Sequence, residues 1–358
     1  MKRVTSIAAL CIAFAVLLGG CAMETKEQAK ARLQVGDGGA TGEASSGSVR
    51  TEAGKLTAVQ FYVPSETDNN LSVIDIPTGK VVGKVKLSEA PSTVVFSSTM
   101  REAYAANMHS STVSIINTQT LKVEKEVPVG PMPHGMVLSP DNKTLYVAAV
   151  ADQFIYLIDT KERKETGTID LGNGAKTNYM SLFGDKLYVS DHENNKVYVV
   201  NVKTKQTLQT IATGKTPRAI KVSDDGKKLF VPAAGDGTLE VYSTETGKLE
   251  SKIAAAAGAT DVVVSEDGNT AIVTSMEGNA VTFIDLASGK PVQTINGLAG
   301  ARHVSFNRQQ TKVYVTLSGS GEVVVIDTEA RTAGERIKVG DKPHGISIKA
   351  LPGIGGSC

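Results

Sequence analysis

The chain repeats itself every 42 residues, and this repeat limits its possible folds more than any other feature. Three independent positions of the repeat recur in seven copies with no insertion between them. The first position holds an aromatic or large aliphatic residue, the second a turn residue that ends an apolar run, and the third Val or Ile. They are Tyr62, Tyr104, Tyr146, Tyr188, Phe230, Ile272 and Tyr314; Asp75, Asn117, Asp159, Asn201, Ser243, Asp285 and Asp327; and Val85, Val127, Ile169, Ile211, Ile253, Ile295 and Ile337. The chain is therefore built from seven copies of one supersecondary unit.

Each copy has the pattern of four short strands. In residues 135–171, the predicted strands cover 135–139, 145–148, 154–158 and 164–171, and a Pro-Asp-Asn-Lys turn separates the first two. Apolar runs of this length between polar turns indicate strands rather than helices. Four strands in about 42 residues match one blade of a β-propeller. We predict an all-β fold, a seven-bladed β-propeller with four-stranded antiparallel blades.

The two ends of the repeat region also predict how the ring closes. The first copy begins at its second strand, with Phe61-Tyr62-Val63, whereas the chain ends on a first-type strand at 345–348. The C-terminal strand is therefore expected to complete the first blade, which leaves no open sheet edge.

The N-terminus has the parts of a secretory signal. A basic start, Met1-Lys2-Arg3, precedes apolar residues 7–18, a stretch too short to span a bilayer comfortably. The following Leu18-Gly19-Gly20-Cys21 resembles the lipobox of bacterial lipoproteins; the alternative is an ordinary signal with a chance cysteine. We expect a lipid anchor on Cys21 and, by the sorting rule that Ala22 satisfies, a place in the bacterial cell envelope, at the outer membrane on its periplasmic or surface side.

These patterns divide the chain into four parts. We predict a lipoprotein signal peptide at 1–20, a flexible Gly/Ser-rich tether at 21–55, the propeller at 56–350 and a tail at 351–358. Cys358 is the one cysteine of the mature chain that lipidation would not use, so no intramolecular disulfide is expected. We expect a monomer.

The net charge argues against a nucleic-acid partner. The chain has a formal net charge of +1, and removal of Lys2 and Arg3 leaves 36 basic against 37 acidic residues. Nucleic-acid binding depends on a basic excess on one face.

The repeat resembles the YVTN family of β-propellers, which includes YncE-like periplasmic proteins. Leu145-Tyr146-Val147-Ala148 is similar to its Tyr-Val-Thr-Asn segment, and Val325-Ile326-Asp327 to its Val-Ile-Asp segment. Residues 129–135 and 339–345 match its Val-Gly-x-x-Pro-x-Gly segment. The resemblance covers about residues 58–350 and implies the fold, but propellers carry unrelated functions.

Overlaying the copies brings all five histidines to one face of the predicted ring. His109 and His192 fall between second and third strands, His134 and His344 directly precede innermost strands, and His303 lies one residue further. The repeat position of His134 should ring the mouth of the central channel. Its members are Ser92, His134, Lys176, Arg218, Thr260, Arg302 and His344.

No member of this ring is acidic, so we expect an electropositive funnel for an anionic ligand or a partner protein. The ligand would be a carboxylate, a phosphate or a propionate-bearing cofactor, held by His134, Lys176, Arg218, Arg302 and His344. The alternative is that these cations are exposed and the Pro-His-Gly turns purely structural. Lysines on the opposite face, such as Lys248, are interpreted as exposed turn residues.

A metal or haem site is a second possibility. His109, His134, His192 and His344 share the face, and imidazole suits copper or haem iron. However, no local motif pairs these ligands, and the blades are expected to fan apart. The d1-haem propellers and the assembly factor NirF resemble the chain in their Pro-His-Gly turns, which implies a cofactor or redox role as the alternative function.

Catalytic motifs are absent from the sequence. It contains no Gly-x-Ser-x-Gly, His-Glu-x-x-His or Walker loop, and acidic pairs such as Asp224-Asp225 lie in predicted turns. We therefore expect a binding or scaffolding propeller rather than an enzyme, with no named catalytic residue.

Overall fold

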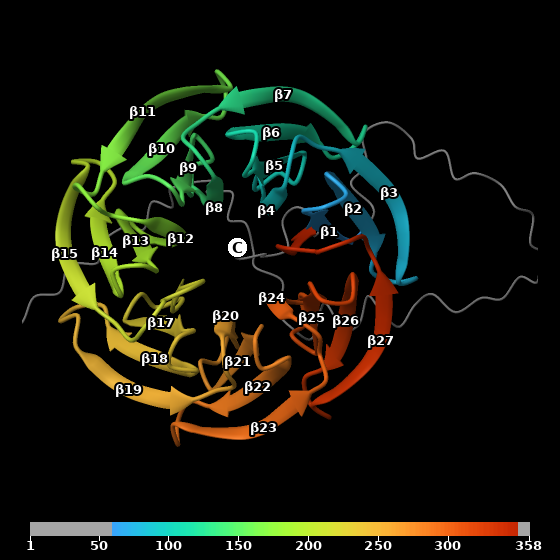
Figure 1. Cartoon of the computed structure of the whole chain (residues 1–358), viewed down its shortest axis with the longest axis vertical. Helices are drawn as coiled ribbons and strands as arrows, with labels where there is room; N and C mark the ends of the chain where they lie inside the picture. Colours follow the sequence, from blue (N-terminus) through green and yellow to red (C-terminus); the bar gives the residue numbers. More distant parts are fainter. Residues whose placement is uncertain (1–58, 350–358) are drawn as a thin grey trace, which may run out of the picture. The chain divides into compact units, whose positions relative to one another are not determined.

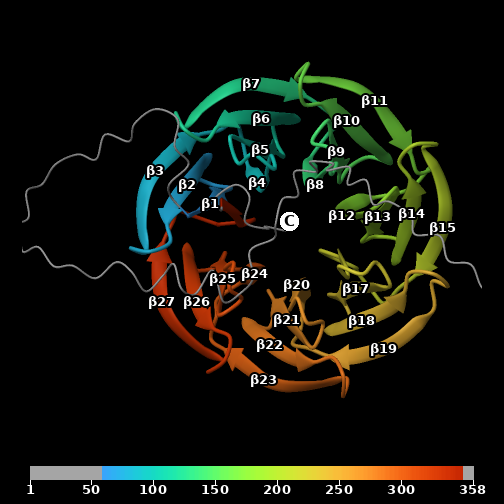
Figure 2. The ribbon, with the colours of Figure 1, turned by 180° about the vertical axis from the view of Figure 1, so that it is seen from behind.

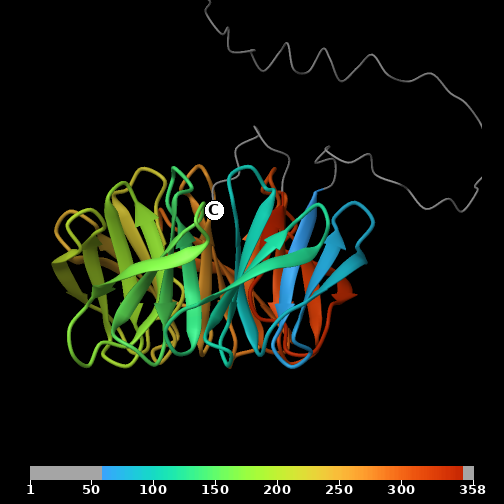
Figure 3. The same ribbon diagram turned by 90° about the horizontal axis from the view of Figure 1, so that it is seen from above.

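The computed structural model describes residues 59–349, which form a ring of seven sheets around a central axis (Figures 1 and 2). Each sheet has four antiparallel strands, and Figure 3 shows the ring from its side. No helix in this part of the chain is long and apolar enough to cross a membrane. The predicted signal peptide, the tether with Cys21 and the tail lie outside the described residues.

The blades are lettered A to G here, and their strands run outward from the axis in the order given. Blade A contains β28 (Ser347–Lys349), β1 (Gln60–Ser65), β2 (Asn70–Asp75) and β3 (Lys80–Lys86); blade B β4 (Pro91–Phe96), β5 (Glu102–Asn107), β6 (Thr112–Asn117) and β7 (Lys122–Pro128); blade C β8 (Pro133–Leu138), β9 (Thr144–Ala149), β10 (Phe154–Asp159) and β11 (Lys164–Asp170); and blade D β12 (Thr177–Phe183), β13 (Lys186–Asp191), β14 (Lys196–Asn201) and β15 (Gln206–Ala212).

The remaining blades follow the same order. Blade E contains β16 (Lys221–Val222), β17 (Lys228–Ala233), β18 (Thr238–Ser243) and β19 (Leu249–Ala254); blade F β20 (Ala259–Val264), β21 (Thr270–Ser275), β22 (Ala280–Asp285) and β23 (Lys290–Asn296); and blade G β24 (Ala301–Phe306), β25 (Lys312–Leu317), β26 (Glu322–Asp327) and β27 (Thr332–Lys338). The seven-bladed, four-stranded prediction is confirmed.

The burial of each strand explains the sequence pattern. The two middle strands of a blade are covered on both faces by neighbouring blades, so β9 is buried from Leu145 to Ala149 and is apolar throughout. The outermost strand β3 alternates between exposed and half-buried residues over most of its length, because only one face meets protein. The apolar runs in the sequence are therefore the middle strands.

The hydrophobic core lies between neighbouring blades. Contacts of the same kind join the first blade to the last. Tyr62 of blade A packs edge-on against Phe96 of blade B, with ring centroids 4.9 Å apart. At the closure, the Phe61 ring lies 3.8 Å from that of Tyr314 in blade G. Strand β28 pairs with β1, Tyr62 opposite Ser347, so the C-terminal strand completes the first blade as predicted.

Candidate functional site

Each loop before an innermost strand has a left-handed residue two positions before the ring residue. All seven have φ between 48° and 86°, and four are not glycine. They are Ala90, Met132, Gly174, Thr216, Gly258, Gly300 and Lys342. This conformation is energetically unfavourable for a non-glycine residue, so the surrounding structure must stabilise the loop. This turn directs the following residues toward the axis.

The entrance of these strands is irregular as well, which brings two successive side chains into the site. The pairing of β24 with β25 shifts register between Ala301 and Val304. A bulge of this kind breaks the strict alternation of side chains. Both Arg302 and His303 consequently contribute to the channel mouth.

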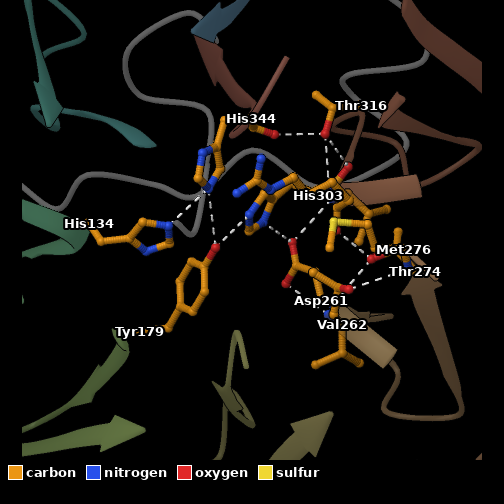
Figure 4. Close-up of polar contacts among 12 residues, drawn as sticks. His134, Tyr179, Asp261, Val262, Thr274, Met276, His303, Thr316 and His344 are labelled. Atoms are coloured by element: carbon orange, nitrogen blue, oxygen red, sulfur yellow. Dashed lines mark hydrogen bonds and ion pairs between the residues drawn. The ribbon is translucent and has the colours of Figure 1, made fainter. Parts of the chain in front are cut away.

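His134 and His344 meet across the channel, although their blades are two apart (Figure 4). Their Nε2 atoms are 3.0 Å apart, and both side chains are buried. The expectation that the blades fan apart and separate these residues is therefore wrong. The ring of innermost strands is narrow enough for two imidazoles to span it.

Tyr179 connects this pair to a third histidine. Its hydroxyl lies 2.7 Å from His303 Nε2 and 3.5 Å from His344 Nε2. On the far side of the imidazole, His303 Nδ1 lies 2.9 Å from Asp261 Oδ2, and this oxygen also accepts a hydrogen bond from the Val304 amide. Figure 4 shows the resulting chain from Asp261 to His134. An ionised Asp261 requires a proton on His303 Nδ1, which leaves Nε2 to accept from the tyrosine.

Glu66 places a carboxylate against the ring, which was expected to be electropositive. Its Oε1 lies 2.7 Å from Arg302 Nη1 and 2.5 Å from His344 Nδ1, although the second contact is not aligned as a hydrogen bond. The ion pair with Glu66 therefore neutralises Arg302, which is not a free cation at the channel mouth. The uniformly electropositive funnel is corrected to a mixed cluster.

Arg218 and Lys176 keep their charges available. No ion pair involves the Arg218 guanidinium within residues 59–349, and Lys176 Nζ contacts a backbone carbonyl, that of Ala151, at 3.5 Å. Nearby, His192 Nδ1 and His134 Nδ1 are buried and have no hydrogen-bond partner among residues 59–349. Thr260 and Ser92, the neutral members of the ring position, hydrogen-bond to backbone carbonyls.

Burial controls the charge state of the cluster. It holds the pKa of His134 and of His344 well below the ordinary value of 6.5, and the positive charge of Arg302 lowers both further. Burial also lowers the pKa of His192, with Arg218 acting in the same direction. It raises the pKa of the Tyr179 hydroxyl. These histidines are neutral near pH 7 and serve as hydrogen-bonding groups rather than cations.

A cavity of about 190 Å³ opens along the channel beside the cluster. Tyr179, Asp261 and His303 form its polar wall, and Met136, Ile220 and neighbouring apolar residues form the rest. The site thus combines a buried polar network with a small channel cavity.

His109, another of the metal candidates, does not join the cluster. His109 is exposed in the turn between β5 and β6, and its backbone amide donates to the Glu89 carbonyl. In the described part of the chain, no group of three or more His, Cys, Asp or Glu side chains is arranged to hold a metal ion. The set His109, His134, His192 and His344 is therefore not brought together.

Sequence reasoning placed His303 on this face without assigning it to the site, and it did not assign Glu66, Tyr179 or Asp261. Glu66 occupies the same repeat position as His192, and Asp261 the same position as His303 one blade later. Counting by 42 aligns Tyr179 with valine in three other blades, but β12 is shifted by two residues against β13, and Tyr179 therefore lies at the strand position of Asp261 and His303. Comparing every position across blades, rather than the histidines alone, would have pointed to Glu66 and Asp261.

Fold and site together define a seven-bladed β-propeller with a buried polar cluster at its channel mouth. Residues 186–351 match the family described as YNCE-like beta-propeller. This match covers a little under half of the chain and, together with the seven-bladed ring, supports the YncE-like β-propeller that the resemblance implied.

Solved structures support the same fold at low sequence identity. A functionally unknown protein from Desulfotomaculum acetoxidans is 16% identical with a TM-score of 0.70, and covers 82% of this chain and 99% of its own. Kuenenia stuttgartiensis hydrazine synthase is 18% identical with a TM-score of 0.69, over 79% and 99%. The dihydro-heme d1 dehydrogenase NirN in complex with DHE is 15% identical with a TM-score of 0.62, over 83% and 76%. No curated protein sequence matches the chain.

Proposed function

We propose that this propeller is a non-enzymatic binding protein that holds an anionic small molecule, or an acidic group of a partner protein, at its channel mouth. One observation carries the proposal: His134 Nδ1 and His192 Nδ1 are buried without a hydrogen-bond partner in the described part of the chain, and both lie in the field of Arg218, which has no ion pair there. Buried polar atoms in folded proteins usually have partners, and a bound ligand supplies one where the protein does not.

The charges favour an anion at this point. Arg218 lowers the pKa of His134, His192 and His344, so its guanidinium acts on all three rings. Neutral imidazoles can donate a hydrogen bond to an oxyanion while Arg218 and Lys176 supply the charge. Arg302 contributes less, because Glu66 already neutralises it.

Replacing Arg218 tests this function. Binding of phosphate, acetate and citrate to the full chain would be measured by calorimetry for the native protein, for Arg218→Ala and for Lys248→Ala. Lys248→Ala removes an equal charge from a turn on the opposite face. We expect Arg218→Ala to weaken binding at least tenfold and Lys248→Ala to leave it unchanged. Equal affinities in all three proteins, or no binding of any probe to the native protein, would contradict the proposal.

The gathering of three histidines and a tyrosine at the axis is the observation that favours the second candidate, a cofactor or redox role. Imidazole is an axial ligand of haem iron and binds copper. The channel cavity of about 190 Å³ is smaller than the roughly 300–1,000 Å³ of typical ligand pockets, so a haem does not fit inside it. A visible spectrum and elemental analysis of protein purified from its own host would decide, since absence of both haem absorbance and copper would reject this candidate.

We also propose that the protein is held in the bacterial envelope by acylation of Cys21. The signal-like N-terminus supports this, and two or more acyl chains anchor a protein stably. Metabolic labelling with a palmitate analogue should mark the native protein and not Cys21→Ser; equal labelling of both would refute it.

A further inference from the structure

The phenol of Tyr179 has a hydrogen-bond partner that distinguishes it from the other tyrosines. The chain has nine tyrosines, all within residues 59–349. The hydroxyls of Tyr104, Tyr156, Tyr198 and Tyr242 contact carboxylates, and that of Tyr62 contacts a backbone carbonyl. Within the described residues, Tyr179 is the one tyrosine with a hydroxyl in hydrogen-bond contact with histidine.

We propose that Tyr179 is a redox-active tyrosine, which gives one electron to an oxidant while its proton passes to His303. The oxidant would be a high-potential metal centre of a partner protein. In this step the phenol O–H bond breaks, the proton forms a new N–H bond at His303 Nε2, and the oxidant is reduced by one electron. The products are a neutral tyrosyl radical, an imidazolium and the reduced partner. This inference does not depend on anion binding at Arg218.

The geometry supports transfer of the proton together with the electron. A phenol that loses an electron becomes strongly acidic, and the proton needs to travel only along the 2.7 Å contact between Oη and Nε2. An imidazole is a stronger base than a carboxylate by roughly two pKa units in water. The histidine partner can therefore keep the proton, whereas the carboxylate partners of the other tyrosines retain it poorly near neutral pH.

Asp261 completes the relay by stabilising the charge that forms. Its Oδ2 lies 2.9 Å from His303 Nδ1, and the amides of Val262 and Val304 fix the carboxylate. A carboxylate held behind an imidazole sets the tautomer and stabilises the imidazolium. The positioning role of Asp261 is thus to keep Nε2 unprotonated before the transfer and to offset its charge afterwards.

The surroundings would protect the radical. The rings of His134 and His303 lie 4.6 Å and 5.3 Å from the Tyr179 ring, and both histidines are buried. The other wall of the phenol is the small channel cavity. Among residues 59–349, the Tyr179 hydroxyl makes its hydrogen-bond contacts with His303 and His344.

Photo-oxidation of the full chain tests the proposal. A laser flash in the presence of a ruthenium tris-bipyridyl sensitiser and persulfate would generate the oxidant, and electron paramagnetic resonance would detect tyrosyl radical. We expect a long-lived radical in the native protein, a loss of at least tenfold in Tyr179→Phe, and no change in the matched control Tyr104→Phe.

The proton acceptor is tested separately. His303→Gln keeps a hydrogen-bond acceptor that cannot hold the proton, so radical formation should slow at least tenfold and its solvent isotope effect should change. If that variant does not fold, Asp261→Asn should show slower formation as well. An unchanged radical in Tyr179→Phe, or unchanged kinetics in the folded acceptor variants, overturns the inference. Tyr179→Phe should lose the radical and keep the anion binding of the native protein, which separates the two proposals.

Discussion

At the scale of single residues, the site depends on imidazoles that the fold keeps neutral. His134 and His344 are fully enclosed, and Glu66, Arg302, Arg218, His303 and Tyr179 surround them with both signs of charge. Adding a proton to either ring would place a buried positive charge in the field of Arg302 and Arg218. The cluster is therefore more sensitive to acid than the rest of the channel.

Stability should fall as the pH drops below about 6.5. The pKa of His134 and His344 is depressed in the folded state, so the unfolded chain binds more protons below the ordinary histidine pKa, and the free energy of unfolding decreases as pH falls. Each histidine contributes at most about 1.4 kcal/mol per pH unit in this window.

Urea unfolding between pH 7.5 and 5 measures the effect. His134→Gln should reduce the slope by about one proton's contribution, whereas His109→Ala, a change in an exposed turn, should preserve it. A slope that is the same in all three proteins would show that the buried pair does not control the acid response.

At the scale of strands, the Pro-His-Gly segments have a packing role that accompanies the histidine. A Cβ on Gly135 would collide with the carbonyl oxygen of Asn178 and come within 2.8 Å of Tyr179 Cα. Gly345 likewise lies against Ser92 O, at 2.9 Å from its ideal Cβ position. The glycine thus allows neighbouring innermost strands to approach closely enough for the histidine rings to meet.

Gly135→Ala should consequently destabilise the protein by about 1–3 kcal/mol, the usual cost of overpacking. Gly334→Ala is the matched control, because its nearest neighbour is a carbonyl oxygen at 3.6 Å and β27 lies at the rim of blade G. Urea midpoints compare the two. A loss in Gly334→Ala as large as in Gly135→Ala would mean that close approach is not the cause.

Strands and blades could be predicted from the sequence because their signals are local and repeat seven times. The turn before Leu145 and the apolar run that follows it determine a strand without reference to distant residues. The cluster depends instead on the radius of the ring. No spacing in the sequence states that His134 reaches His344, 210 residues later, or that Glu66 meets Arg302, because these contacts arise only after all blades close.

At the scale of the whole molecule, one short strand joins the ends of the ring and supplies part of the site. β28 has three residues, and its pairing with β1 is the hydrogen-bonded closure of blade A. His344 lies just before it, and the His344 amide donates to the Pro64 carbonyl. Closure of the propeller and assembly of the histidine cluster are therefore the same event.

A chain that ends at Lys338 should lose both. Without β28, strand β1 exposes an unpaired edge and the rings of His134 and Tyr179 lose His344, so we expect an unfolding transition that is broader and several kcal/mol less stable, or no folded ring at all. A chain that ends at residue 350 keeps β28 and serves as the control.

A synthetic peptide of residues 339–349 should restore the truncated chain, since an extended peptide can add a strand to a sheet edge. Circular dichroism and urea unfolding with and without the peptide measure this. A truncated chain as stable as the control would show that the blades close without the terminal strand, and rescue by the peptide would show that β28 acts through pairing rather than through covalent continuity of the chain.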